Sequence, residues 1–472
     1  MAITLAQAKT EIAKLYIATF NRIPDKAGLD YWANAYVNGA SKDAIAQSFT
    51  GVKEFINKYS STTTSSDYVE QVYKNVFGRS SDTSGKAFWT KALDGGLSKG
   101  DLLNAMVNAA SALNNNDGQK LTKQVDYAVK QADAGVNTTD ANAYMKSITA
   151  NTDPTKATSG KVMDGYIKSA TVFIDANGNG KLDAGEISTT TNALGDYSFT
   201  SGGYGQIIST GGTDVTTGKA SNVTLKSLGD GSVLSPTSTM LANQSLTSNK
   251  TVSELTSSLA TSTGTSADQI LNYDPVAILK STTATPEEKA AALKLQSMNV
   301  EVNNVLSVAA SSLKGAGLSI DSEAVQNAIE SLSAKLMDSF AANTDSTKNV
   351  FEDKSLLSSA MSDIFKSLND SISDPTLSAS LDKLTAGVDN ITTAVADGNA
   401  KIDNQKDAAI TSGGYASALT SIDKYQETIQ DTMGSKLEGG LSSLDTLAND
   451  FSGSALDTAA NDAKTGDSTD TT

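Results

Sequence analysis

The sequence predicts an α+β multidomain protein, with an N-terminal all-helical tandem repeat, a small central β-sandwich and a C-terminal helical bundle. Three observations carry this prediction. A pattern within residues 1–112 recurs 57 positions later, and short runs of Val, Ile, Tyr, Phe and Thr alternate with Gly and Asn over residues 161–240. Apolar residues then follow helical spacing over residues 241–455. The length of 472 residues also fits about three domains.

The N-terminal repeat consists of aromatic, charged and glycine residues at fixed spacing. The first copy has Tyr16, Phe20, Arg22, Asp25, Gly28 and Trp32, and the second has Tyr73, Phe77, Arg79, Asp82, Gly85 and Trp89. Each copy predicts a helix, a loop and two further helices, with Pro24 ending the first helix and Ser41 capping a third helix over residues 42–55. We expect the aromatic residues to form core and Arg and Asp to hold the loop; direct contact with a ligand is the alternative.

This pattern resembles the helical repeat domain of unknown function found in bacterial surface-layer proteins and type I-secreted proteins. The resemblance covers residues 1–112, about a quarter of the chain. It implies a terminal domain that anchors the protein to the cell surface or its glycans, or that takes part in assembly.

The middle and C-terminal segments follow from composition and periodicity. Residues 113–160 predict a helical linker, and residues 161–240 a β-sandwich module with strands at 170–174, 196–200, 206–210 and 222–228. Residues 241–455 predict a helical bundle, including a helix from Thr285 to Gly315 that opens with a capping box. Apolar residues over 377–395 have coiled-coil spacing; we expect them to pack inside the bundle, with a free coiled coil as the alternative. Residues 456–472 predict a flexible acidic tail.

A calcium-binding loop is predicted at residues 175–186, which read DANGNGKLDAGE. The spacing places Asp175, Asn177, Asn179, Lys181 through its carbonyl, Asp183 and Glu186 at the ligand positions of a twelve-residue calcium loop. Calcium takes six to eight hard oxygens, and Gly180 at the sixth position allows the sharp turn that presents them. Only three of the ligands are carboxylates, which predicts weak binding, in the range of ~10⁻⁴–10⁻³ M.

The strand-like flanks of this loop argue against an EF-hand. The segment over residues 162–210 is similar instead to calcium-loop β modules of bacterial surface proteins, including the collagen-adhesin B-type and carboxypeptidase-regulatory-like families. The resemblance implies a structural Ca²⁺; an Asx-rich turn without an ion is the alternative. A second partial match, at Asp397, Asn399 and Asp403, lacks the closing acid, and we expect it to be a solvated loop.

Composition excludes several classes of function. The chain has no Cys and no His, which excludes disulfides, thiol catalysis, Ser-His-Asp triads and His-ligated metals. The net charge of -16 argues against nucleic acid and anionic membranes as partners. No apolar run is long enough to span a membrane, and the first residues form an amphipathic helix, not a signal peptide.

Together these features predict a structural protein, not an enzyme. We expect it to self-assemble into a calcium-stabilised surface layer, sheath or filament on a bacterial cell, after secretion without an N-terminal signal peptide. Type I secretion is compatible with the acidic, hydroxyl-rich tail. The expected partners are further copies of the chain and a cell-surface glycan bound by the N-terminal domain. The alternative is a monomeric adhesin or glycan-binding protein; a carboxylate-based hydrolase and a cytoplasmic helical scaffold are more distant alternatives.

Overall fold

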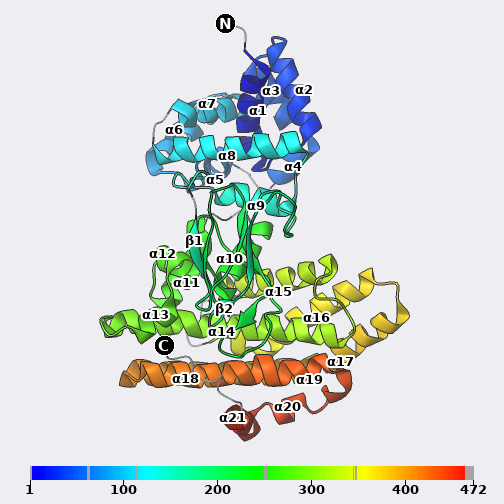
Figure 1. Ribbon diagram of the computed structural model, residues 1–472. Helices are drawn as coiled ribbons and strands as arrows, with labels where there is room; N and C mark the ends of the chain where they lie inside the picture. Colours follow the sequence, from blue (N-terminus) through cyan, green and yellow to red (C-terminus); the bar gives the residue numbers. More distant parts are fainter. Residues whose placement is uncertain are drawn as a thin grey trace. The chain divides into compact units, whose positions relative to one another are not determined.

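The computed structural model describes residues 3–60, 64–112, 115–156, 158–248, 250, 252–343, 345 and 348–462. It confirms the fold class: a helical N-terminal region, a small central β region and a helical C-terminal region (Figure 1). The chain divides into two compact units. Unit 1 contains Met1–Lys156, Ile174–Glu186 and Gly202–Gln206; unit 2 contains Ala157–Phe173, Ile187–Ser201 and Ile207–Thr472.

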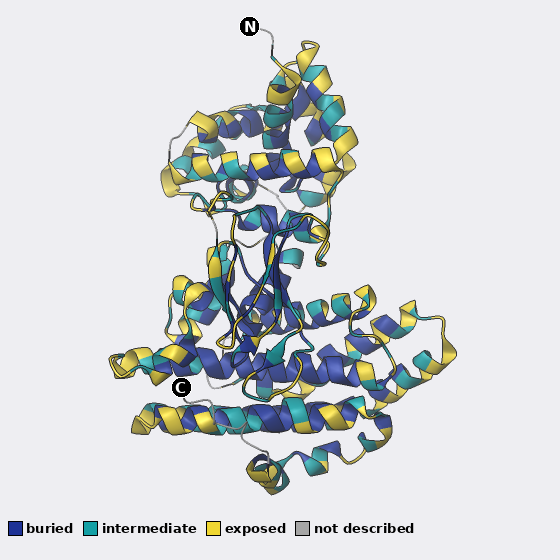
Figure 2. Ribbon diagram, in the orientation of Figure 1, coloured by how far each residue is buried: buried dark blue, intermediate teal, exposed yellow. Residues whose placement is uncertain are grey.

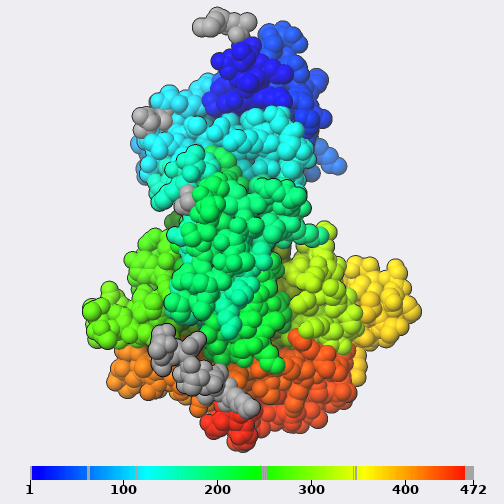
Figure 3. All heavy atoms as spheres, viewed as in Figure 1, coloured from blue at the N-terminus to red at the C-terminus, as the bar shows by residue number. Residues whose placement is uncertain are grey.

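Unit 1 is built on helices. They are α1 (Leu5–Phe20), α2 (Lys26–Val37), α3 (Lys42–Thr50), α4 (Lys53–Lys58), α5 (Ser65–Phe77), α6 (Thr83–Asp94), α7 (Lys99–Ala112), α8 (Asn116–Ala134) and α9 (Thr139–Ser147). Polar side chains cap several of them: Asp25 caps α2, Ser41 caps α3 and Asp82 caps α6. In Figure 3 the first repeat copy is dark blue and the second lighter blue to cyan.

One predicted helix of unit 1 is two helices. The helix expected over residues 42–55 stops at Thr50, because Gly51 closes α3 and Val52 takes an extended conformation before α4 begins. Glycine is a poor helix former, since its backbone loses the most freedom when it becomes helical. The break lets Phe55 and Tyr59 of the following turn pack against Tyr68 of the second copy.

The central β region consists of three small sheets. Its strands are β1 (Ser159–Val162), β2 (Ile167–Lys168), β3 (Thr171–Asp175), β4 (Ser188–Thr190), β5 (Asp196–Ser198), β6 (Gln206–Thr210), β7 (Thr213–Asp214), β8 (Leu225–Lys226) and β9 (Val233–Leu234). The sheet orders are β5-β1-β9, β2-β7 and β4-β3-β6-β8. The strand expected over 222–228 is only two residues long in β8, where it pairs antiparallel with β6.

The helical part of unit 2 forms an internally packed bundle. Its elements are α10 (Pro236–Thr247), α11 (Val252–Thr263), α12 (Ala267–Asn272), α13 (Pro275–Lys280), α14 (Pro286–Gly315), α15 (Glu323–Ala342), η1 (Val350–Glu352), α16 (Lys354–Ser371), α17 (Pro375–Ser412), α18 (Tyr415–Gln426), the π-helix η2 (Glu427–Met433), α19 (Gly434–Glu438), η3 (Leu441–Ser443), α20 (Leu447–Asp450) and α21 (Gly453–Asp462). The start of α14 is the predicted capping box of Thr285 and Glu288. Figure 2 shows the middle of α14 buried on all sides, so α14 is the central helix of the bundle.

The coiled-coil spacing of α17 is used inside this bundle. Leu381, Leu384, Val388, Ile391 and Val395 are buried, and α17 packs against α14, α16 and α18. The expectation of a solvated loop at 397–403 is wrong, because these residues continue α17. Residues 456–462 of the predicted tail belong to α21, and residues 463–472 lie outside the described residues.

Candidate functional site

The predicted calcium loop begins at the end of β3 and lies in unit 1. Asp175, at its first position, is buried, and its carboxylate accepts hydrogen bonds from backbone N–H groups of the loop itself. Its Oδ1 accepts from Gly178 at 2.7 Å and Asn179 at 3.2 Å, and its Oδ2 accepts from Gly180 at 2.8 Å. Gly178 and Gly180 both have positive φ, at 66° and 74°, so the chain wraps around this carboxylate where non-glycine residues would be strained.

The other predicted side-chain ligands converge on the same loop. Asp183 Oδ2 accepts from the amide nitrogens of Asn177 and Asn179, each at 2.6 Å. Glu186 closes the loop: its Oε1 accepts from the Ala176 N–H at 2.8 Å and its Oε2 from the Asp183 N–H at 3.0 Å. The twelve residues thus fold into one closed turn with three carboxylates.

The oxygen-bearing side chains of this loop are of the types that bind calcium, but two of the amide groups would have to rotate first. Burial raises the pKa of Asp175 to about 6, and the charge of Glu186 adds to that effect. The loop places three carboxylates close together, and a bound cation would favour their charged forms. Calcium would need the amide oxygens of Asn177 and Asn179 where their nitrogens now lie, so both amides would rotate on binding. Among the described residues, no group of three or more acidic side chains is already arranged to hold a metal ion.

The loop is attached to the helices of the predicted linker. The Thr138 hydroxyl donates to the Gly178 carbonyl at 2.6 Å, and Gln131 Nε2 donates to the Ala176 carbonyl at 2.8 Å. A Cβ at Gly178 would lie 2.3 Å from the backbone nitrogen of Ala141, so only glycine allows this approach. The sequence analysis did not predict this attachment. Anything that stiffens the loop also stiffens α8 and α9.

The repeat motif holds the loop between the first two helices of each copy. In the first copy the Arg22 guanidinium donates twice to Glu54, at 2.7 and 2.8 Å, and lies over the rings of Tyr16 and Phe20. Asp25 accepts from the Gly28 N–H at 2.7 Å. A Cβ at Gly28 would lie 2.4 Å from the Tyr16 hydroxyl, which explains the glycine of the motif.

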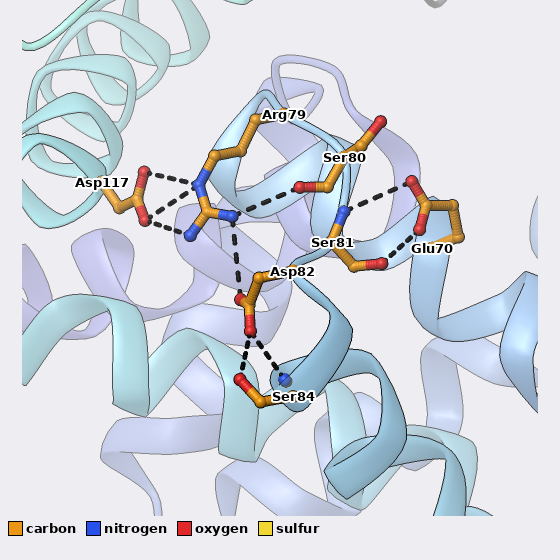
Figure 4. Close-up of polar contacts among 8 residues, drawn as sticks. Glu70, Arg79, Ser80, Ser81, Asp82, Ser84 and Asp117 are labelled. Atoms are coloured by element: carbon orange, nitrogen blue, oxygen red, sulfur yellow. Dashed lines mark hydrogen bonds and ion pairs between the residues drawn. The ribbon is translucent and has the colours of Figure 1, made fainter.

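The second copy repeats this arrangement with a different acidic partner (Figure 4). Arg79 donates to Asp117 at 2.8 Å and to the Ser80 carbonyl at 3.2 Å, and Asp82 accepts from the Gly85 N–H at 2.8 Å. Arg79 is more exposed than Arg22, 46% against 25% of the side chain. Because both copies have this geometry, it supports the expectation that Arg and Asp hold the loop.

Each copy also presents one aromatic ring to solvent. Tyr31 of α2 is 66% exposed, and Phe88, at the equivalent position of α6, is 65% exposed. Each ring lies edge-on against the following tryptophan, Trp32 or Trp89, with ring centroids 4.9 and 5.0 Å apart. The two rings thus occupy equivalent exposed positions, 57 residues apart in the sequence.

The two copies define a tandem helical repeat domain, and the comparison with protein families assigns it. Residues 7–55 and 46–116 match the family described as Domain of unknown function (DUF4214). The chain thus carries a DUF4214 domain at its N-terminus, as the resemblance of the repeat implied. Searches of curated proteins and of solved structures found no match. In the part of the chain that the structure describes, no helix is both long enough and apolar enough to cross a membrane.

Proposed function

We propose that the protein is a structural component of a bacterial cell surface that self-assembles, outside the cell, into a layer, sheath or filament. The observation that carries the proposal is the pair of equivalent exposed rings, Tyr31 and Phe88. One chain thereby presents the same type of contact twice, through two copies of one domain. Contacts that do not close on themselves extend into open assemblies.

Calcium supports this assembly by stiffening the loop of residues 175–186. Asp175, Asp183 and Glu186 would supply carboxylate oxygens, Asn177 and Asn179 amide oxygens, and Lys181 its carbonyl. Because the loop is hydrogen-bonded to Gln131 and Thr138, ordering it would fix α8 and α9 as well. The role is structural, and weak binding is sufficient where extracellular calcium is at millimolar concentration.

The alternative function, glycan binding by separate molecules, is favoured by one feature of the second copy. A hollow of about 560 Å³ lies between α5 and α6 and is lined by polar groups, including Glu70, Ser81, Lys86 and Asp94. Glu70 accepts from the Ser81 N–H at 3.3 Å and from its hydroxyl (Figure 4). A carboxylate, an ammonium and hydroxyl groups are suited to the hydroxyl groups of a sugar.

Negative-stain microscopy tests the proposal. Purified protein is imaged with millimolar calcium and then with a chelator. We expect ordered sheets or fibres with calcium and their loss on chelation. The double variant Tyr31→Ser with Phe88→Ser should stay dispersed in both conditions. Ile56→Ser is the matched control, because it removes an apolar side chain of similar exposure, 58%, from the same domain.

Three outcomes would contradict the proposal or one of its parts. Dispersed wild-type particles in both conditions would reject self-assembly and favour the glycan-binding alternative, which an array of immobilised glycans then tests. Assemblies that the double variant still forms would reject the role of the two rings. Assemblies that persist in chelator would reject the role of calcium and leave residues 175–186 as a turn.

A further inference from the structure

Unit 2 contains a second group of acidic and amide side chains, drawn from four separate segments. Asp164 follows β1, Asp214 ends β7, Asn303 lies in the middle of α14, and Gln426 and Gln430 lie at the junction of α18 and the π-helix η2. A single nitrogen, Gln426 Nε2, donates both to the Asp164 carbonyl at 2.8 Å and to Asp214 Oδ2 at 3.1 Å. We call these five residues the Asp164 cluster.

The backbone is built to bring the two acids together. Gly165 has φ +100°, and a Cβ there would lie 2.3 Å from the Thr216 hydroxyl and 2.9 Å from Asp214 Oδ1. The strand pairing that follows, Ile167 opposite Asp214, fixes the same register. A π-helix is rare and frequently lies at functional sites, and here it carries Gln430 into the cluster.

Several buried oxygens of the cluster have no hydrogen-bond donor. They are Asp164 Oδ1, Asn303 Oδ1 and Gln426 Oε1. Their side chains are 5%, 5% and 0% exposed. A buried acceptor that is left without a partner destabilises the folded chain. All three are oxygens, so the missing partner is a hydrogen-bond donor or a cation.

Two of the three residues that carry these oxygens, Asp164 and Asn303, line a cavity of about 200 Å³. It is lined by Asp164, Asp214, Asn303 and Gln430 among others, and it is large enough for an ion with its remaining water. Two lysines also line it, but each is committed to another acid: Lys219 pairs with Asp431 at 2.9 Å and Lys314 with Glu438 at 2.7 Å. Among the described residues, neither Asp164 nor Asp214 forms an ion pair with a lysine or an arginine.

We propose that the Asp164 cluster binds a hard divalent cation, of which calcium fits best. Two carboxylates and the free amide oxygens supply oxygen ligands, and water in the cavity completes the shell. Calcium accepts such an irregular mixture of ligands, whereas magnesium requires near-ideal octahedral geometry. This site is separate from the loop of residues 175–186. It has two acids, and amide side chains supply its other oxygens.

The same burial shifts the pKa values of the two acids of the cluster. It raises the pKa of Asp164 well above its usual range, with the charge of Asp214 as the second cause, and it raises the pKa of Asp214 to about 7. Asp423 adds negative charge nearby without lining the cavity. A bound dication would neutralise the two carboxylates where no side chain does.

The test measures thermal unfolding of the full chain with a chelator and with 5 mM calcium chloride. Both tryptophans of the chain are in unit 1, so their fluorescence reports unit 1, while far-UV circular dichroism also follows unit 2. All variants carry Glu186→Gln, which removes the closing ligand of the 175–186 loop. In this background we expect calcium to raise the dichroism-detected midpoint by roughly 5 °C.

Asp164→Asn should abolish this rise. An asparagine there can still accept the hydrogen bond from Asn303, so the variant should melt no lower than its parent in chelator. Asp214→Asn is an independent second variant with the same expectation of no response to calcium. Asp423→Asn, with the same change in charge, is the control and should keep the response. Magnesium chloride at the same concentration should give a smaller rise.

Other outcomes would overturn the proposal. Equal calcium responses in Asp164→Asn and its parent would show that the cluster does not bind the ion. No response in the Glu186→Gln parent, with a response in the wild type, would assign all binding to the loop. No response in any protein would reject both sites.

Discussion

Two buried groups of acids in unit 2 solve the same electrostatic problem in different ways. The first consists of Glu301, Glu352 and Asp403, and it contains its own cation, Lys406, which pairs with Asp403. The second, the Asp164 cluster, has a cavity and free oxygens in place of a lysine. Burying a charge without a partner costs several kcal/mol. The comparison shows that the charge of buried acids can be compensated by a lysine of the same chain or by a cation bound from solution.

In the lysine-containing group the pKa values of the acids shift in opposite directions. Burial opposes the charge of Asp403, but Lys406 and hydrogen bonds from Glu301 and Glu352 bring the pKa of Asp403 below its usual value. Burial, followed by the charge of Asp403, raises the pKa of Glu301 well above its usual value and that of Glu352 to about 7. Asp403 and Lys406 are thus shifted toward their charged forms, and the two glutamates toward their protonated forms.

Removing the internal cation should produce the largest effect. Lys406→Met keeps roughly the length of the side chain and leaves the half-buried Asp403 without its partner, so we expect a loss of about 2–3 kcal/mol in unfolding free energy. Lys401→Met is the matched control on the same helix; its pair with Asp457 is more exposed than that of Lys406 with Asp403, so the loss should stay below about 1 kcal/mol. Urea unfolding followed by circular dichroism measures both. Equal losses in the two variants would show that the group does not depend on Lys406.

The second prediction concerns pH. Glu301 binds its proton more tightly in the folded chain than in the unfolded chain, so its contribution to stability is complete at low pH and decreases as pH rises through the folded pKa. The slope reaches about 1.4 kcal/mol per pH unit for one such carboxyl. Glu301→Gln keeps a donor but has no proton to lose. Its unfolding free energy should therefore fall less between pH 6 and pH 8 than that of the wild type.

The measurement is a series of urea titrations at four pH values over that range. Gln at position 301 can keep the hydrogen bond from Asn349 that Glu301 Oε2 accepts at 2.9 Å, so the variant should fold. Parallel pH profiles for the two proteins would mean that Glu301 binds no more protons in the folded chain than in the unfolded chain over this range, and would contradict the raised pKa of Glu301.

The two kinds of acidic site also differ in how far sequence predicts them. The loop of residues 175–186 was predicted because its candidate ligands belong to twelve consecutive residues, whose spacing alone sets the turn. The Asp164 cluster joins residues 164, 214, 303 and 426, and no local spacing records that they meet. At Asn399 the local pattern was misleading. Because the partial calcium spacing lacks its closing acid, a solvated loop was expected there, whereas α17 buries Asn399 against Asn304.

In the N-terminal repeat, too, local spacing predicts the motif but not the contacts with residues far away in the sequence. Arg22 and Arg79 were predicted to hold equivalent loops, and they do so over equivalent aromatic rings. Their acidic partners were not predicted, because Ser111 stands where a second Glu54 would be, and Asp117 of the following helix replaces it. Local spacing therefore predicts the motif, while the partner depends on how the next helix packs.

The smallest effect is expected from a variant that adds a negative charge to the loop of residues 175–186. Asn179→Asp gives the 175–186 loop a fourth carboxylate, and ligand charge is one of the factors that set calcium affinity. Because the new carboxylate faces Asp183, we expect lower stability in chelator and about tenfold tighter calcium binding, measured by calorimetric titration in an Asp164→Asn background. Lys181→Gln makes the same change in net charge at a position that offers only its carbonyl, so its affinity should change less than about threefold. If both variants tighten binding equally, the loop attracts calcium through its general charge, and the prediction that residue 179 is a ligand is wrong.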